Sequence, residues 1–130
     1  SGFSIDVGSN EALSGFSDEI LLWDDIMPPS VWHGELEEWR NFPYLSEGFG
    51  FKAKNQERAE ALGRIRCFNH AAQLSLGNLA NDIPHASFGA ERVARSVTAA
   101  LFVEDADTHF NRLLEYDDPE LQGNEWPGKL

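Results

Sequence analysis

The residues best suited to chemistry surround one predicted turn in the second half of the chain, between positions 69 and 87. His70 and His85 stand on either side of this turn. An imidazole titrates near neutral pH, so either histidine could give a proton to a reaction intermediate. A loop histidine with no catalytic task is the alternative at both positions. Asp82 lies between them and is either a cap or turn residue or a contact to a bound group.

A helix is predicted directly after this turn, from about Ser87 to Phe102, because apolar residues recur there at helical spacing. Its inner stripe consists of Phe88, Val93, Ala94, Val97, Ala100 and Leu101. The first turn of a helix carries free N–H groups and about half a positive charge, so it can stabilise a phosphate or a developing anion. Gly77 and Gly89 would let backbone approach a ligand closely. An ordinary strand–loop–helix crossover is the alternative.

Other reactive groups point to structure rather than catalysis. Asp105 and His109 share a helix face, but two ligands do not make a coordination sphere, so no metal site is predicted and Asp105 is expected to cap a helix. The neighbouring carboxylates Asp24 and Asp25 would point apart, which is unsuited to paired acid–base work. The single cysteine, Cys67, lies in an apolar stretch and is expected to be a buried structural thiol.

The elements that must position these groups indicate a mixed α/β fold. Residues 64–69 alternate polar and apolar, which predicts a strand, and a second helix is expected from about Asp105. Short helices are expected at 31–40 and 55–62, and residues 19–23 are either helix or strand. The 130 residues form a single domain or a fragment. Its parts are an irregular aromatic-rich part (1–63), a strand, loop and helix (64–102) and a C-terminal helix and tail (103–130).

Charge and composition exclude several classes of partner. The formal net charge is -12, which argues against nucleic acid and against an anionic membrane surface. Residues 51–101 are mildly basic between two acidic flanks, so they are either a solvated surface or face a phosphate-bearing cofactor. The one unpaired cysteine predicts a reducing, cytoplasmic location. No apolar run approaches the ~20 residues that span a bilayer.

Several motifs resemble the C-terminal part of flavin-containing and related class B monooxygenases. Gly2 and Phe3 resemble the end of the Ala-Thr-Gly-Phe/Tyr segment of that family, and residues 42–51 are similar to a segment that follows it in some bacterial members. The strongest resemblance runs from Ile65 to Phe102, where a strand, a loop reaching Ile83-Pro84 and a helix follow one another. The resemblance implies the C-terminal portion of a Rossmann-type FAD-binding fold.

The resemblance also implies cofactors and roles. The complete enzyme would use FAD and NADPH to oxygenate a small organic substrate. The positions that match cofactor-binding sites are Gly2, Phe3, Asn69, Asp82, Ile83, Pro84 and Ser87. The sequence contains no Gly-x-Gly-x-x-Gly fingerprint, so tight FAD binding by this chain alone is not expected. The expected partners are the remainder of the flavoprotein, a second chain or another copy of this one.

A second hypothesis needs no catalysis. The chain would then be an acidic interaction module whose tryptophan-rich first half packs against a partner. The rings of Trp23, Trp32, Trp39 and Phe49 would form that interface or the core. In the flavoprotein hypothesis they are candidates for a substrate channel wall.

Overall fold

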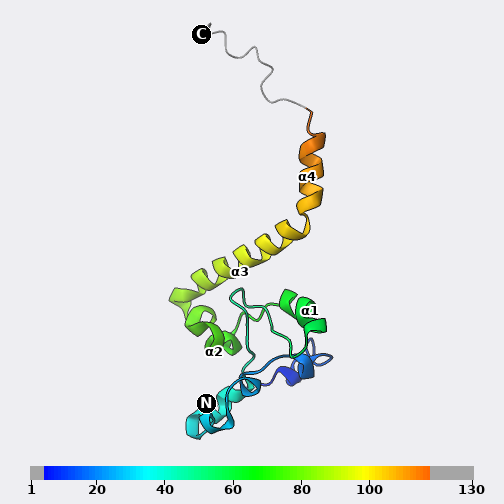
Figure 1. Ribbon diagram of the computed structural model, residues 1–130. Coiled ribbons are helices and arrows are strands. Elements are labelled where there is room, and N and C mark those ends of the chain that lie inside the picture. The colour runs from blue at the N-terminus through cyan, green and yellow to red at the C-terminus, as the bar shows by residue number, and fades with distance from the viewer. Residues whose placement is uncertain (1–4, 118–130) are drawn as a thin grey trace. The chain divides into compact units, whose positions relative to one another are not determined.

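The computed structural model describes residues 5–117, so Gly2 and Phe3 lie outside the described residues. Packing divides the chain into two compact units, Ser1–Val97 and Thr98–Leu130. The described residues form four α-helices, which Figure 1 labels: α1 (Ala59–Arg64), α2 (Gln73–Leu76), α3 (Ile83–Glu104) and α4 (Ala106–Glu115). Helix α3 contributes residues to both units.

Short 3-10 helices make up much of the first unit. Their bounds are η1 (Val7–Ser9), η2 (Ser17–Glu19), η3 (Trp23–Asp25), η4 (Pro29–Val31), η5 (Gly34–Asn41), η6 (Gln56–Arg58), η7 (His70–Ala72) and η8 (Gly77–Ala80). The helix expected at 31–40 is therefore present only as η5. Gly34 has a φ of 59°, outside the helical region, so η5 cannot extend back to Val31 as one regular helix.

Three extended segments close a small ring of backbone hydrogen bonds in this unit. Tyr44 N–H donates to Leu21 O (2.8 Å), Leu21 N–H donates to Lys52 O (2.8 Å), and Lys52 N–H donates to Tyr44 O (3.2 Å). The antiparallel bridges Ile20–Ala53 and Leu22–Pro43 flank the ring. Each segment pairs with two neighbours for only one or two residues, so no ladder long enough to be a strand develops.

The expected α/β, Rossmann-type fold is wrong for the part of the chain that is described. Residues 5–117 contain helices and isolated β-bridges but no β-strand and no β-sheet. The strand predicted at 64–69 is a short extended stretch after α1, where the bridge Gly50–Arg66 and a bond from Cys67 N–H to Phe49 O (2.8 Å) hold it. The polar–apolar alternation correctly indicated extended backbone, but a sheet needs partner strands, which this chain does not provide.

The core of the first unit is built from buried apolar side chains around the turn at 46–50. Its members are Ile20, Leu45, Phe49, Phe51, Leu62, Cys67, Ala71 and Ala72. Phe49 is fully buried and has a φ of 67°, a conformation that costs an L-residue about 1–3 kcal/mol. Its ring packs edge-on against Phe68, with centroids 5.2 Å apart. The burial of this ring offsets the backbone strain of the turn.

Within the first unit, the N-terminal part of α3 packs closely against other segments at two glycines, Gly89 on the helix and Gly48 on the turn opposite Ser96. A Cβ on Gly89 would lie 2.3 Å from Leu79 O and 2.8 Å from Phe68 Cε2, and a Cβ on Gly48 would lie 2.0 Å from Ser96 Oγ. The helix that was expected to begin near Ser87 begins one turn earlier, at Ile83.

Among the described residues, the second unit contains the end of α3 and helix α4. Phe102 stacks on His109 with ring centroids 5.3 Å apart, and Asp105 N–H donates to Leu101 O (3.0 Å). Asp105 is the N-cap residue of α4, as expected, although its side chain makes no capping bond. Within residues 5–117, no helix combines the length and apolar character needed to cross a bilayer.

Candidate functional site

A cavity of about 560 Å³ opens between the N-terminal segment and the extended stretch after α1. One wall comes from residues 5–13: Ile5, Asp6, Val7, Ser9, Asn10, Ala12 and Leu13. The opposite wall consists of Pro43, Phe51, Ile65, Arg66, Cys67, Asn69, His70 and Ala71. Its volume lies in the range of roughly 300–1,000 Å³ that is usual for small-molecule sites.

Asn69 is held at this cavity by its role as the N-cap of η7. Its Oδ1 accepts from Ala71 N–H (2.9 Å) and from the Cys67 thiol (3.5 Å). The side-chain oxygen is thereby used within the turn. The Nδ2 group has no protein partner among the described residues and is available to a ligand.

His70 follows Asn69 and lines the same cavity. Its ring lies edge-on to Phe42, with centroids 5.7 Å apart, and Phe42 in turn stacks on Trp39 at 5.5 Å. No residue in the range 5–117 forms a hydrogen bond with the His70 imidazole. The aromatic contact fixes the ring while leaving both nitrogens available for proton exchange.

Arg66 brings a positive charge to the lining. One Nη donates to Gly63 O, and the buried Nε has no hydrogen-bond partner. No carboxylate between residues 5 and 117 forms an ion pair with this guanidinium. Asp6 is the one carboxylate of the lining, and its Oδ1 accepts from Gly8 N–H (2.8 Å).

Ser75 of α2 ties the segments behind this wall together. Its Oγ accepts from Trp23 Nε1 (3.1 Å) and from Leu45 N–H (3.1 Å) and donates to Pro43 O (3.1 Å). Trp23 also packs edge-on against Tyr44, with centroids 4.9 Å apart. This single hydroxyl thus positions α2, and the turn that carries His70, against the bridged segments.

The other predicted site residues lie at the start of α3. Asp82 O accepts from His85 N–H (2.9 Å) and Ala86 N–H (2.8 Å), and Asp82 Oδ2 lies 3.0 Å from His85 Nδ1. Ile83 is 93% exposed. Because the helix begins at Ile83, Ser87 sits in its second turn, and the free amides expected near Ser87 lie one turn earlier.

The structure therefore brings some predicted residues together and leaves others apart. Asn69 and His70 share the cavity wall. The lining does not include the group at the start of α3, which consists of Asp82, Ile83, Pro84, His85 and Ser87. Sequence reasoning missed Arg66, Asn10 and Ser75. An asparagine two residues before an alanine, in Asn10-Glu11-Ala12 and Asn69-His70-Ala71, was the one signal that could have indicated the two asparagine turns.

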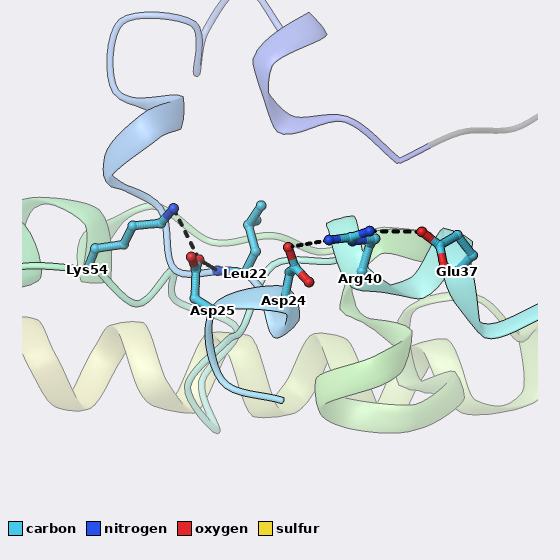
Figure 2. A network of polar contacts seen from close by, with 6 residues as sticks. All are labelled: Leu22, Asp24, Asp25, Glu37, Arg40 and Lys54. Atoms are coloured by element: carbon cyan, nitrogen blue, oxygen red, sulfur yellow. Dashed lines mark hydrogen bonds and ion pairs between the residues drawn. The ribbon is translucent and has the colours of Figure 1, made fainter. Parts of the chain in front are cut away.

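The acidic pairs of the first half serve structure, as Figure 2 shows. Asp24 bonds Arg40 (2.9 Å), which also bonds Glu37 (2.8 Å). Asp25 instead binds Lys54 (3.1 Å) and accepts from the N–H of Leu22 (2.8 Å). The hydrogen bonds that Arg40 donates to Asp24 and, to a lesser extent, to Glu37 raise the pKa of its guanidinium. These carboxylates face different partners, which agrees with the expectation that they point apart.

Cys67 is a free, buried cysteine at this cavity. Burial raises the pKa of the Cys67 thiol from 9.0 to about 11, so the thiol stays protonated at neutral pH. No cluster of three potential metal ligands occurs within residues 5–117. The cavity wall around Asn69, His70 and Arg66 is thus the part of the described chain best equipped to bind a small molecule.

A site of this kind, with apolar walls and a few convergent donors, is typical of proteins that bind small organic ligands. Over 117 residues, 88% of its length, the chain is 29% identical to a FAD-dependent urate hydroxylase of Xanthomonas campestris pv. campestris. The match spans 24% of that protein, so this chain corresponds to about a quarter of it. No family model matches the chain, and no solved structure matches it significantly.

Proposed function

We propose that this chain forms part of a flavin-dependent oxidoreductase that oxidises a small organic molecule. The similarity to a FAD-dependent urate hydroxylase carries the proposal. The match includes most of the chain, and the chain contains a ligand-sized cavity with polar residues of the expected flavin-facing turn in its wall. Urate, the substrate in the name of that relative, is the first compound to test.

The residues present can bind a carbonyl-bearing ring, a description that covers both a flavin and a small heterocyclic substrate. The free Nδ2 of Asn69 and the imidazole of His70 can donate to carbonyl oxygens of a bound ring. The strict Gly-x-Gly-x-x-Gly fingerprint does not occur in the sequence. Residues 48–53 fit its alanine-ending form, but they lie in a turn and isolated bridges and do not open a helix, so other polypeptide would hold the phosphates of FAD. When bound, FAD would supply the redox chemistry, with NADPH as the proposed reductant and oxygenation as the proposed reaction.

The share of this chain in the reaction is binding, orientation and proton transfer. Phe42 holds the ring of His70 at the cavity wall, which keeps the imidazole within reach of a bound ligand. Imidazole is the side chain best suited to give and take a proton at neutral pH. Ser75 keeps the turn in register through three hydrogen bonds. The remainder of the flavoprotein, in the cytoplasm, is the proposed partner.

The test compares two histidines in the natural protein that contains this sequence. Urate-dependent NADPH oxidation should fall about 100-fold in His70→Gln, the usual order for the loss of a general acid or base. His85→Gln is the matched control and should keep most activity, because His85 pairs with Asp82 outside the cavity. Equal activity of both variants would refute the assigned role of His70. Absence of flavin from the protein would refute the whole proposal.

A second candidate function, an acidic interaction module, is favoured by the exposed apolar face of the second unit. Six large hydrophobic side chains described there are 59–74% exposed: Phe102, Val103, Phe110, Leu113, Leu114 and Tyr116. Exposed apolar clusters of this kind mark interfaces. Light scattering of the isolated chain should show concentration-dependent association that Leu114→Glu abolishes and Asn111→Glu does not. A clean monomer at high concentration would contradict self-association.

A further inference from the structure

We infer that the cavity between residues 5–13 and the Ile65–Ala71 stretch is the substrate subsite, and that it takes a flat, carbonyl-bearing aromatic heterocycle. The identification of this ligand as the substrate rests on the proposed function. The binding itself is a property of the described chain and is tested without any cofactor.

The walls of the cavity favour a flat, partly apolar molecule. Val7 and Leu13 face it from the N-terminal segment, and Pro43, Phe51 and Ile65 line the opposite side. The volume of about 560 Å³ accommodates one small ring system with its solvation. Contact with apolar walls on two sides supplies affinity, while polar groups fix orientation.

The polar groups of the cavity are arranged as donors. Asn10 and Asn69 both turn their Oδ1 toward a backbone amide two residues on: Ala12 N–H at 2.9 Å and Ala71 N–H at 2.9 Å. Each asparagine lines the cavity, one on each wall, and its Nδ2 group has no hydrogen-bond partner among the described residues. Because these amino groups can only donate, they select a ligand with acceptors such as carbonyl oxygens or unprotonated ring nitrogens.

The charge of the lining further restricts the class of ligand that the cavity can bind. Arg66 is the one arginine or lysine in the lining, and it forms no ion pair among residues 5–117. Asp6, the one carboxylate of the lining, carries the opposite formal charge but accepts from Gly8 N–H rather than pairing with Arg66. The guanidinium can therefore bind a neutral carbonyl compound or a monoanion. The net charge of -12 opposes polyanions such as nucleotides. A flavin ring shares this chemistry with a free heterocycle, so the experiment must separate the two.

The experiment measures binding of urate to the 130-residue chain by calorimetry, with riboflavin as the second probe. Saturable urate binding is expected, with no binding of riboflavin. Asn69→Asp keeps the capping oxygen but removes the donor, and it should weaken urate binding about tenfold, the value of roughly one hydrogen bond. Asn10→Asp tests the opposite wall with the same expectation.

Asn55→Asp is the matched control. Asn55 caps η6 through the same kind of bond, to Arg58 N–H at 3.1 Å, and does not line the cavity. This variant adds the same charge and should leave urate affinity unchanged. If Asn69→Asp does not fold, Asn10→Asp carries the comparison.

Three outcomes would overturn the inference. These are absence of saturable urate binding, equal weakening by Asn55→Asp and the two cavity variants, or binding of riboflavin in place of urate. Urate binding by a protein that proves to contain no flavin would leave the site standing and refute the proposed function. If the natural protein contains flavin but the 130-residue chain does not bind urate, the proposed function stands and the inferred urate site is refuted.

Discussion

Replacement of Gly89 by alanine should destabilise the first unit, although alanine is the better helix former. The new Cβ would lie 2.3 Å from Leu79 O and 2.8 Å from Phe68 Cε2, well inside ordinary contact distance. Overpacking of this kind costs ~1–3 kcal/mol, and the upper part of that range applies because one contact is backbone. The gain in helix propensity is about 1 kcal/mol. The net loss of unfolding free energy should therefore be about 1–2 kcal/mol.

Gly63→Ala is the matched control with the opposite expected sign. Gly63 also lies in a helix, α1, and a Cβ there would meet no atom within 4 Å. This variant should gain about 0.5–1 kcal/mol. Urea unfolding followed by circular dichroism and tryptophan fluorescence measures both, and the midpoints should differ by about 1 M for an m-value near 2 kcal/mol per M. Equal stabilisation by the two alanines would refute the close packing of α3 on η8.

Three further expectations follow from the same contacts. Ser75→Ala leaves Trp23 Nε1–H and Leu45 N–H without their acceptor, so it should cost about 2–4 kcal/mol of unfolding free energy in urea, whereas the exposed Ser14→Ala should cost under about 0.5 kcal/mol. Burial raises the pKa of the Cys67 thiol, so the stability that the protonated thiol contributes is full below pH 9.0 and is lost as pH rises toward about 11. Cys67→Ala should therefore flatten the decline of unfolding free energy at alkaline pH, and an unchanged decline would contradict this expectation. FAD should bind the isolated chain more weakly than about 1 µM in a fluorescence titration, and tighter binding would show that the absent fingerprint is unnecessary.

The two C-terminal helices were predictable because their signals are local. Apolar residues recur at helical spacing along α3 and α4, and Asp105 marks the break between the two helices. The predicted start of α3 lies one turn too late because the sequence pattern assigns Ile83-Pro84 to the preceding loop. Proline is compatible with the first turn of a helix, and the helix accommodates it there.

The α/β prediction was wrong because local pattern cannot show whether an extended segment has partner strands. Alternation at residues 64–69 reports an extended backbone with two faces, but a strand exists only where a neighbour pairs with it. Here the neighbour is the tight turn around Phe49, which offers a single bridge. The mixed α/β prediction rested on this alternation and on the helical patterns, and the resemblance added the Rossmann-type assignment. The described residues do not contain the sheet that either would require.

The sequence predicted residues of only one wall of the candidate site. His70 is a candidate because it borders the predicted turn before α3, and Asn69 is a candidate because it matches a cofactor-binding position of the resembled family. The opposite wall, with Asn10, comes from a segment more than fifty residues away, and only tertiary packing joins the two. The donor role of Arg66 depends on the absence of an acidic partner in space, which composition does not report.

The absorbance spectrum of the natural protein that contains this sequence tests the central claim most directly. If this chain is part of a flavoprotein, the purified protein should be yellow, with the flavin band near ~450 nm that the cofactor ring itself produces. A folded, intact protein with no such band, and with none after incubation with FAD, would contradict the account.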